Sequence, residues 1–545
     1  MGFMERDVSD ASPRNTWAHL VCVLLGLAQA LSLAWPFEGP FKGTSFGGLQ
    51  MLSMGAFAWM LTQSTHAKSA FLKGWLFSLA WLIGSTWWLF ISMHTYGGLS
   101  TVWACLAVFA LSAGLALIYG AACVVFRLIL GVEGRVVSPA FAFAAIWTLA
   151  EIVRGTLWTG FPWGAVGYAH IDGQLQHWAP WVGVYGVCFL AAFFSMGAAR
   201  VIQMNRSISP IEWGTLALIL AGLSWTWLAS PSQSAHAPES TRAPLRVSLL
   251  QGNIPQDLKF GAGVSRALRD YRQALLASQS DLTVTPETAL PLTPEQLPDQ
   301  YWSEIEAHFS SGSQAALIGL PLSMRNAQGQ RQYSNSALGL MPQATPASTA
   351  RYQYDKHHLV PFGEFVPPLF QWFVRQLNIP LGEFTRGDIA QPTLNIKGER
   401  IAPNICYEDL FGEELARSFI DPDTAPTFMV NLSNIAWFGD TVAIDQHLNI
   451  SRMRALEMGR PMLRATNTGA TAVINERGEV THRLPSAVSG VLTADVYGVH
   501  GPVTPYARWV AVAGLWPLVA VAVFILCVIG IITRRSAGES GRFAP

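Results

Sequence analysis

Two hydrophobic patterns divide this chain into a helical part and a mixed part. Apolar runs of about 20 residues, the length that crosses a bilayer as a helix, recur along the first 229 residues and once near the C-terminus. The first run is too long, and too poorly followed by small residues, for a cleaved signal peptide. We expect about eight transmembrane helices, at roughly 17–36, 46–63, 71–93, 99–126, 137–154, 178–200, 211–229 and 507–533.

Shorter apolar runs rich in Val, Leu and Ile fill the region between the last two of these spans. They are typical of β-strands and lie at 245–254, 281–287, 315–322, 336–341, 400–408, 427–434, 471–478 and 490–497. Helical periodicity appears at 264–278 and 445–459. This alternation predicts an α/β sandwich with paired sheets between helix layers.

The expected organisation is therefore a membrane domain followed by a second domain and a final helix. Its segments are a membrane domain over 1–229 with seven helices, a polar linker over 230–244, an α/β domain over 245–506, a last transmembrane helix over 507–533 and a tail over 534–545.

Composition and charge support this division. Only 13% of the residues are charged, against about 25% in an ordinary soluble domain. Of the 35 acidic residues 26 fall between 231 and 506, as do 21 of the 35 Lys and Arg residues. That segment therefore faces water. The formal net charge is +0, so nothing favours a nucleic-acid partner.

The positive-inside rule predicts the orientation. With a cytoplasmic N-terminus, eleven Lys and Arg residues flank the spans on the cytoplasmic side and three on the other, namely Lys42, Arg154 and Arg508. Seven spans before the α/β domain then place that domain outside the cytoplasm.

One cysteine of six differs from the rest. Five lie in expected spans, where a cysteine is a small hydrophobe. Cys406 lies in the motif NICYEDL, where an apolar run ends and a polar one begins. It has no disulfide partner in the external domain, so it is either a buried core residue or a reactive thiol.

A reactive cysteine needs a base or a cation to form its thiolate. His357 and His358 are one possible source of the base. Glu287, at the end of another expected strand, and Lys356 are an alternative, in which the carboxylate takes the proton and the ammonium stabilises an oxyanion. Each residue also has an ordinary structural explanation, Glu287 as an acid at a helix start and Lys356 as a surface lysine.

Eight motifs spread over nearly the whole chain resemble those of the bacterial apolipoprotein N-acyltransferases. They are WTGFPWGAVGYAHID, LLQGNIPQDLKF, TPETALP, DKHHLVPFGEFVP, NICYEDLF, NLSNIAWFG, RMRALEMGRPMLRATNTG and TPYAR. The resemblance implies a polytopic α-helical membrane domain and a nitrilase-like α-β-β-α sandwich. It also implies a catalytic triad of Glu287, Lys356 and Cys406.

The resemblance extends to supporting residues. It implies that Glu364 helps to position the triad, that Tyr407 and Glu408 follow the nucleophile, and that Asn467 to Gly469 lie beside the site. The chain departs from the family pattern at Phe260, where Trp is common, and at Ile435, where an acid is common. Phe260 keeps an aromatic surface for a lid or an acyl chain, whereas Ile435 removes a carboxylate.

The segment 365–384 is apolar and contains Phe370 and Trp372. It is either ordinary core or a membrane-dipping lid that contacts acyl chains.

The activity that the resemblance implies is transfer of an acyl chain from a glycerophospholipid to the N-terminal amine of a diacylated apolipoprotein, through a thioester. The implied partners are these two lipids and no nucleic acid, in a protein that we expect to be a monomer in the bacterial inner membrane with its catalytic domain in the periplasm. No cluster of metal ligands indicates a metal or other cofactor.

Three alternatives remain. A membrane-tethered nitrilase-type amidase or hydrolase would use the same triad, but it would need only one anchor. A transporter would need more ionisable residues within its spans than Glu151 and Arg154, which lie near one span end. A scaffold without activity would not need the complete triad.

Overall fold

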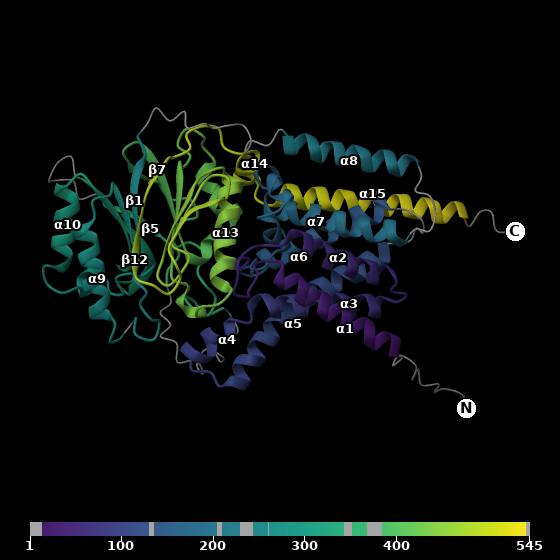
Figure 1. Cartoon of the computed structure of the whole chain (residues 1–545), viewed down its shortest axis with the longest axis horizontal. Coiled ribbons are helices and arrows are strands. Elements are labelled where there is room, and N and C mark those ends of the chain that lie inside the picture. Colours follow the sequence, from purple (N-terminus) through teal and green to yellow (C-terminus); the bar gives the residue numbers. More distant parts are fainter. Residues whose placement is uncertain are drawn as a thin grey trace.

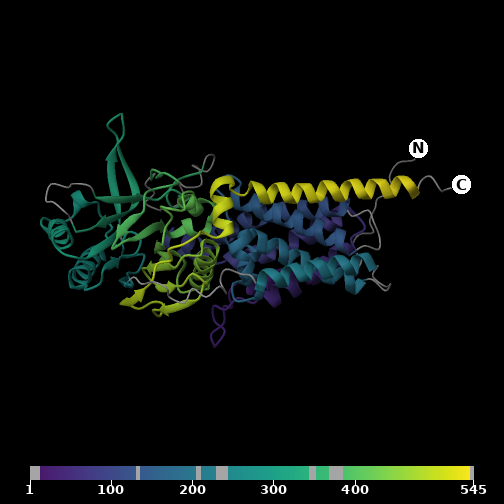
Figure 2. The same ribbon diagram turned by 90° about the horizontal axis from the view of Figure 1, so that it is seen from above.

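The computed structural model describes residues 13–129, 136–203, 210–228, 243–259, 261–342, 351–367 and 384–540. The molecule is elongated, with a bundle of helices at one end and two β-sheets at the other (Figure 1). The first helix begins and the last helix ends at the end of the bundle that is farther from the sheets (Figure 2).

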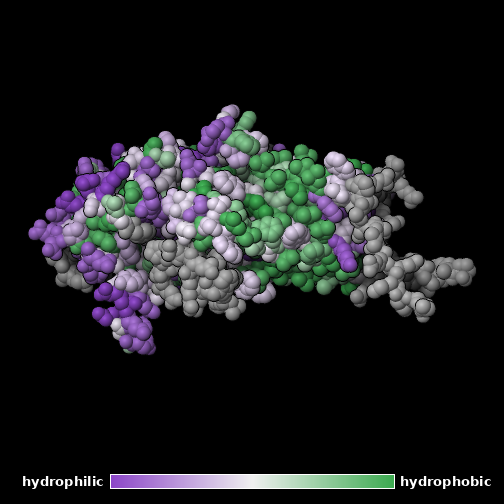
Figure 3. All heavy atoms as spheres, turned by 90° about the horizontal axis from the view of Figure 1, so that it is seen from below, coloured by the Kyte–Doolittle hydropathy of each residue, from purple (hydrophilic) through white to green (hydrophobic). Residues whose placement is uncertain are grey.

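A helix lies within or across each stretch that we expected to span a membrane. The helices are α1 Pro13–Leu31, α2 Gly47–Thr62, α3 Ala67–Thr86, α4 Leu89–Ile91, α5 Thr101–Ile129, α6 Val137–Thr156, α7 Ala179–Gln203, α8 Pro210–Leu228, α14 Pro505–Ala513 and α15 Trp516–Ser540. On the face seen in Figure 3, the surface of the bundle is mostly apolar, whereas the surface over the sheets is more polar. The membrane domain that the resemblance implies is therefore helical, as expected.

Length and composition alone identify fewer membrane-spanning helices than the eight expected. Among the described residues, four helices are long and apolar enough to cross a membrane, or five if the bent pair Ala67–Thr86 and Leu89–Tyr96 forms one span. The helix α2 has 16 residues, which cover about 24 Å of a core that is about 30 Å thick. The helix expected over 507–533 is divided at Gly514, and its membrane-length part begins at Trp516.

The second domain contains two sheets, each with six strands among the described residues. One has the order β12-β1-β2-β3-β4-β5 and the other β11-β10-β9-β8-β7-β6. Parallel pairs join β1 to β2, β2 to β3, β7 to β8 and β8 to β9. The strands are β1 Leu245–Gln251, β2 Leu282–Val284, β3 Ala315–Arg325, β4 Arg331–Leu340, β5 Tyr352–Asp355, β6 Leu394–Ile396, β7 Glu399–Ile405, β8 Phe428–Ser433, β9 Met462–Thr466, β10 Ala472–Ile474, β11 Val480–Arg483 and β12 Gly490–Val496.

The two sheets face each other between layers of helices. Val247, Leu317, Val430 and Leu463 are among the buried side chains between the sheets. The helices α9 Val264–Ala277 and α10 Tyr301–Ser311 cover the outer face of the first sheet, where Leu268, Ile305 and Ile318 pack together. The helix α13 Ala443–Met458 lies on the opposite side, against the second sheet. This arrangement confirms the expected α-β-β-α sandwich.

The helix α13 also forms the junction with the membrane helices. It is buried along nearly its whole length although its sequence, AIDQHLNISRMRALEM, is rich in polar residues. A helix buried on all sides can carry such residues only if each has a partner. Gln446 accepts hydrogen bonds from the indole nitrogens of Trp88 at 3.2 Å and Trp163 at 2.8 Å. Asn449 donates to the carbonyl oxygens of Leu33 and Gly43.

A kink in α7 supplies another contact at this junction. Gly183 has φ of 65°, a conformation that interrupts the helix and frees the next backbone N–H. That N–H, of Val184, donates to Oε1 of Glu457 in α13 at 2.6 Å. The kink also brings Gly183 against the ring of Tyr506, which leaves no room for a side chain.

We predict that Gly183→Ala destabilises the junction. An added Cβ would lie 2.2 Å from Cε2 of Tyr506 and would require a left-handed backbone that alanine disfavours. The midpoint temperature of unfolding in detergent should fall by several degrees, which corresponds to about 1–3 kcal/mol of overpacking. The matched control is Gly114→Ala in α5, where nothing lies within 4 Å. Equal midpoints for the two variants would contradict this account.

Candidate active site

Cys406 lies at a sharp bend at the end of a strand. It is the first residue after β7 and begins the 3-10 helix Cys406–Leu410. Its φ of 53° lies in the left-handed region, which costs a non-glycine residue about 1–3 kcal/mol. The side-chain amide of Asn431, in the neighbouring strand β8, donates to the carbonyl oxygen of Cys406 at 3.2 Å. The bend leaves Cys406 half-buried at the strand end.

Glu287 lies three residues beyond β2, and both of its carboxylate oxygens are occupied. Oε1 accepts from Nζ of Lys356 at 3.1 Å and from the side-chain amide of Asn335 at 2.8 Å. Oε2 accepts from the backbone N–H of Asn434, just beyond β8, at 3.0 Å. Segments from two sheets therefore hold this carboxylate in one position.

Lys356 follows β5 and is completely buried. Its ammonium lies between two carboxylates, at 3.1 Å from Oε1 of Glu287 and 3.0 Å from Oε1 of Glu364. Burial alone would lower the pKa of Lys356, but the two carboxylates raise it above its ordinary value. The structure thus places Lys356 and Glu287 in direct contact, with Glu364 as a second anion on the same ammonium.

The electrostatics define the resting protonation state. Burial opposes ionisation of Glu287, but Lys356 and Lys259 together with the hydrogen bond from Asn335 hold its pKa below its ordinary value. Burial and the charge of Glu287 raise the pKa of Cys406 to about 12, against the lowering effect of Lys356. At neutral pH the site therefore holds Cys406 as a thiol and Glu287 as a carboxylate.

Two residues of the site were missed by the sequence analysis. Asn335, in β4, donates to Glu287 at 2.8 Å and to Glu364 at 2.6 Å, so it bridges the two acids. Lys259 is buried, and its ammonium donates to the carbonyl oxygen of Glu287 at 3.1 Å and to the hydroxyl of Thr288 at 2.6 Å. Burial lowers the pKa of Lys259 to about 8. A lysine inside the motif QGNIPQDLKF and an asparagine within an apolar strand were the available indications.

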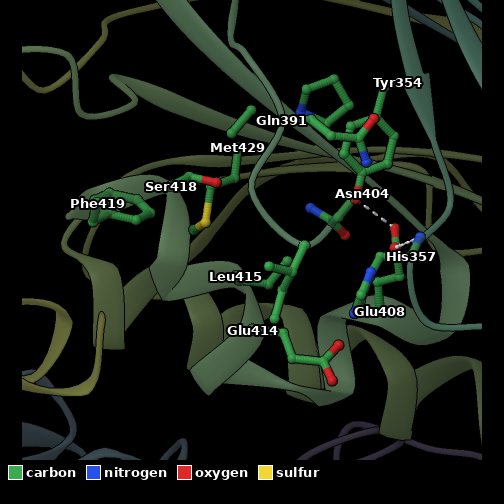
Figure 4. A pocket seen from close by; sticks show the side chains of 13 residues that line it. Tyr354, His357, Gln391, Asn404, Glu408, Glu414, Leu415, Ser418, Phe419 and Met429 are labelled. Atoms are coloured by element: carbon green, nitrogen blue, oxygen red, sulfur yellow. Dashed lines mark hydrogen bonds between the residues drawn. The ribbon is translucent and has the colours of Figure 1, made fainter. Parts of the chain in front are cut away.

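Glu408 joins the segment that carries the lysine to the segment that carries the cysteine. Oε1 accepts from the backbone N–H of His357 at 2.6 Å, and Oε2 accepts from the backbone N–H of Ile405 at 2.5 Å and the hydroxyl of Tyr354 at 2.9 Å. Burial raises the pKa of Glu408 above its ordinary value. The same carboxylate lines a pocket together with Tyr354, His357 and Asn404 (Figure 4). Cys406 does not line it.

Tyr407 and His358 connect the site to the membrane half. The hydroxyl of Tyr407 donates to the carbonyl oxygen of Gly160 at 3.2 Å, and Nε2 of His358 lies 2.9 Å from the carbonyl oxygen of Thr159. His358 also stacks on Phe411 at 3.6 Å between ring centroids. His357 contacts the carbonyl oxygen of Gly387 through Nδ1. The histidines therefore serve packing and docking, whereas the glutamates surround the lysine.

The segment around Ile435 is held without a carboxylate at that position. Ile435 is buried, and the short helix Ile435–Phe438 has no side-chain cap. The side-chain amide of Asn434 instead donates to Oε1 of Gln256 at 2.9 Å, and its oxygen accepts from the amide of Asn467 at 3.0 Å. Asn467 directly follows β9 and therefore lies beside the site.

Phe260, Phe370 and Trp372 lie outside the described residues. In the described part of the chain, no group of three or more His, Cys, Asp or Glu side chains could hold a metal ion.

Comparison with known proteins gives matches over both halves of the chain. The family described as apolipoprotein N-acyltransferase N-terminal domain matches residues 25–197, and the family described as carbon-nitrogen hydrolase matches residues 246–498. The apolipoprotein N-acyltransferase of Verminephrobacter eiseniae is 49% identical, covering 93% of this chain and 95% of that protein. That of Ralstonia nicotianae is 41% identical, covering 97% and 95%. A solved amidase from Nesterenkonia sp. is 18% identical, with a TM-score of 0.33, covering 47% of this chain and 90% of that one.

We predict that two substitutions change the reactivity of Cys406 in opposite directions. Glu287→Gln removes an anion that raises the pKa of the thiol, so more thiolate exists at any pH below that pKa. Alkylation of Cys406 by iodoacetamide at pH 8 should become about tenfold faster, the effect of one pKa unit. Lys356→Gln removes the cation that lowers this pKa, so alkylation should become slower.

Peptide mass spectrometry follows the Cys406 peptide, and the denatured protein gives the rate of an unperturbed thiol. Slower alkylation in Glu287→Gln, with the thermal midpoint unchanged, would show that Glu287 does not act on the sulfur through its charge.

Proposed function

Because the chain belongs to the apolipoprotein N-acyltransferase family, we propose that it acylates apolipoproteins through a thioester on Cys406. The acyl donor is a membrane glycerophospholipid, and the acceptor is the N-terminal α-amine of a diacylglyceryl-cysteine. One observation carries the proposal: the ammonium of Lys356 lies between Glu287 and Glu364, and its charge and that of Glu287 both act on the thiol of Cys406.

The first half-reaction forms the thioester. Glu287 accepts the thiol proton as the sulfur bonds to the ester carbonyl carbon, and the carbonyl oxygen becomes an oxyanion beside Lys356. Collapse of this intermediate breaks the ester C–O bond. Glu287 then returns the proton to the departing oxygen, and lysophospholipid leaves.

The second half-reaction transfers the acyl chain to the amine. The amine nitrogen attacks the thioester carbonyl, the C–S bond breaks, and the electron pair returns to sulfur. Glu287 takes a proton from the nitrogen and restores the thiol. Because one product leaves before the second substrate reacts, the kinetics are ping-pong.

The supporting residues hold this geometry. Glu364 fixes the ammonium of Lys356, Glu408 fixes the segments on either side of the site, and Tyr407 attaches the cysteine segment to the loop at Gly160. Phe260, Phe370 and Trp372 are proposed to contact the acyl chain or to form a lid over it.

The membrane arrangement follows from the reaction. Both substrates are anchored in a bilayer, so the site must lie at its surface. We assign eight spans, within 1–229 and 507–533, a linker at 230–244, a periplasmic catalytic domain over 245–506 and a cytoplasmic tail over 534–545. The protein is proposed to act as a monomer in the bacterial inner membrane.

A membrane-tethered nitrilase-type hydrolase is the main alternative, because water could replace the amine. The extensive junction along α13 argues against it, since a simple tether needs no such contact.

A transporter is disfavoured because Arg154 already donates hydrogen bonds to Glu151, Tyr119 and two backbone carbonyl oxygens. A scaffold would not keep a buried ammonium between two acids beside a free thiol.

The thioester provides the direct test. Purified protein is incubated with phospholipid and no acceptor, and intact and peptide masses are measured. We expect a mass gain of one acyl chain on the Cys406 peptide, removed by hydroxylamine and absent in Cys406→Ala. In Glu287→Gln, adduct formation should fall by about 10²–10⁴-fold, the contribution typical of a general base.

Controls separate the alternatives. No adduct, with free fatty acid released, would favour the hydrolase. No adduct and no fatty acid from folded protein would contradict the proposed function.

The orientation has its own test. Gln328, at the tip of the β3–β4 hairpin, and Lys68, in the first turn of α3, are both exposed. After permeabilisation of the outer membrane, a membrane-impermeant maleimide should label Gln328→Cys in intact cells. It should label Lys68→Cys only after lysis. The reverse pattern would place the catalytic domain in the cytoplasm.

A further inference from the structure

The end of β8 brings a buried hydroxyl to the sulfur of Cys406. The strands β7 and β8 are parallel, with Ile405 aligned to Leu432. Cys406, directly beyond β7, and Ser433, the last residue of β8, are therefore neighbours. The hydrogen bond from Asn431 to the carbonyl oxygen of Cys406 keeps the two strand ends together.

Apart from the sulfur of Cys406, the hydroxyl of Ser433 has no partner in the described structure. Ser433 is completely buried, and its Oγ makes no hydrogen bond to any nitrogen or oxygen of the described residues. A buried hydroxyl that has lost its hydrogen bonds to water needs another acceptor. A sulfur is a weak acceptor as a thiol and a much stronger one when it carries negative charge.

We propose that Ser433 is a further catalytic residue, whose hydroxyl donates a hydrogen bond to the sulfur of Cys406 whenever that sulfur carries negative charge. The inference rests on the proposed role of Cys406 as nucleophile. Contact with Ser433 lowers the pKa of the Cys406 thiol, opposite to the effect of burial and of Glu287.

The other hydrogen-bond donors near the sulfur already donate to the carboxylates of the site. The backbone N–H of Asn434 also lowers the pKa of Cys406, but it donates to Oε2 of Glu287 at 3.0 Å. The ammonium of Lys356 is held by Glu287 and Glu364 and faces the oxyanion in the proposed mechanism. Ser433 is thus the side chain best placed to stabilise the sulfur without weakening the glutamate–lysine pair.

The hydrogen bond acts in both half-reactions. During thioester formation the proton moves from sulfur to Glu287, and Ser433 stabilises the sulfur until its bond to carbon is complete. During aminolysis the C–S bond breaks, the electron pair returns to sulfur, and Ser433 stabilises the thiolate until Glu287 delivers the amine proton. Ser433 keeps its own proton throughout.

The test compares Ser433→Ala with the matched control Ser248→Ala. Ser248 is also a buried strand serine, but it bonds to Ser280 and lies in β1. The readout is the pH profile of Cys406 alkylation by iodoacetamide, together with the rate of thioester formation from phospholipid. We expect Ser433→Ala to alkylate about tenfold more slowly at pH 8, the effect of one pKa unit, with its profile moved to higher pH.

Thioester formation should slow in parallel, and Ser248→Ala should match the wild type in both measurements. Ser433→Thr keeps the hydroxyl and should remain close to the wild-type profile, which a purely steric role would not predict.

A wild-type profile in Ser433→Ala would overturn the inference. So would equal slowing in Ser433→Ala and Ser433→Thr at unchanged thermal midpoints. Neither result would affect the proposed function, which fails only if the wild-type protein forms no thioester.

Discussion

The geometry of the site depends on one buried ammonium. Lys356 is removed from water, and a buried charge that loses its partner costs about 3–5 kcal/mol. Its two partners, Glu287 and Glu364, repel each other, and Asn335 relieves this by donating to both. The four residues come from the ends of β2 and β5, from β4, and from the segment after the lysine. The hydrogen bonds of one ammonium therefore position the site residues that the first sheet supplies. The backbone N–H of Asn434, just beyond β8, connects Glu287 to the second sheet.

The second sheet connects this chemistry to the membrane through polar contacts. Its outer layer, α13, places Gln446, Asn449 and Glu457 against the membrane helices. Apolar side chains at these positions would also pack, but they would not fix one position of α13 relative to the bundle. The cysteine segment makes its own contacts, from Tyr407 to Gly160 and from His358 to Thr159. Hydrogen bonds are directional, so these contacts set the orientation as well as the distance of the candidate site relative to the bundle.

The sequence predicted the architecture well because its elements have strong local patterns. Each of the eight expected strands and both expected helices of the sandwich has a counterpart, whereas β5, β6, β9 and β11 were not predicted. These strands are short, and in a run of four residues such as YQYD at 352–355 the alternation is too brief to predict a strand. Its pairing is set by the neighbouring strand β4. The triad could be proposed from motifs, but Asn335, Lys259 and Ser433 could not. Their roles arise from contacts between distant segments, and a lone polar residue in an apolar strand does not reveal its partner.

The charges around Cys406 impose opposite demands. In the proposed mechanism Glu287 must be ionised to act as a base, yet its charge raises the pKa of the thiol that it would deprotonate. Because the thiolate is the reactive form, the resting sulfur is protected from oxidation in the proposed periplasmic location. Binding of a substrate carbonyl would make deprotonation of the thiol easier, because the negative charge would then move from sulfur to an oxygen beside Lys356. Glu287 is already positioned to accept the proton. The same pairing that keeps the free enzyme unreactive thus makes proton transfer favourable once an acyl carbonyl is bound.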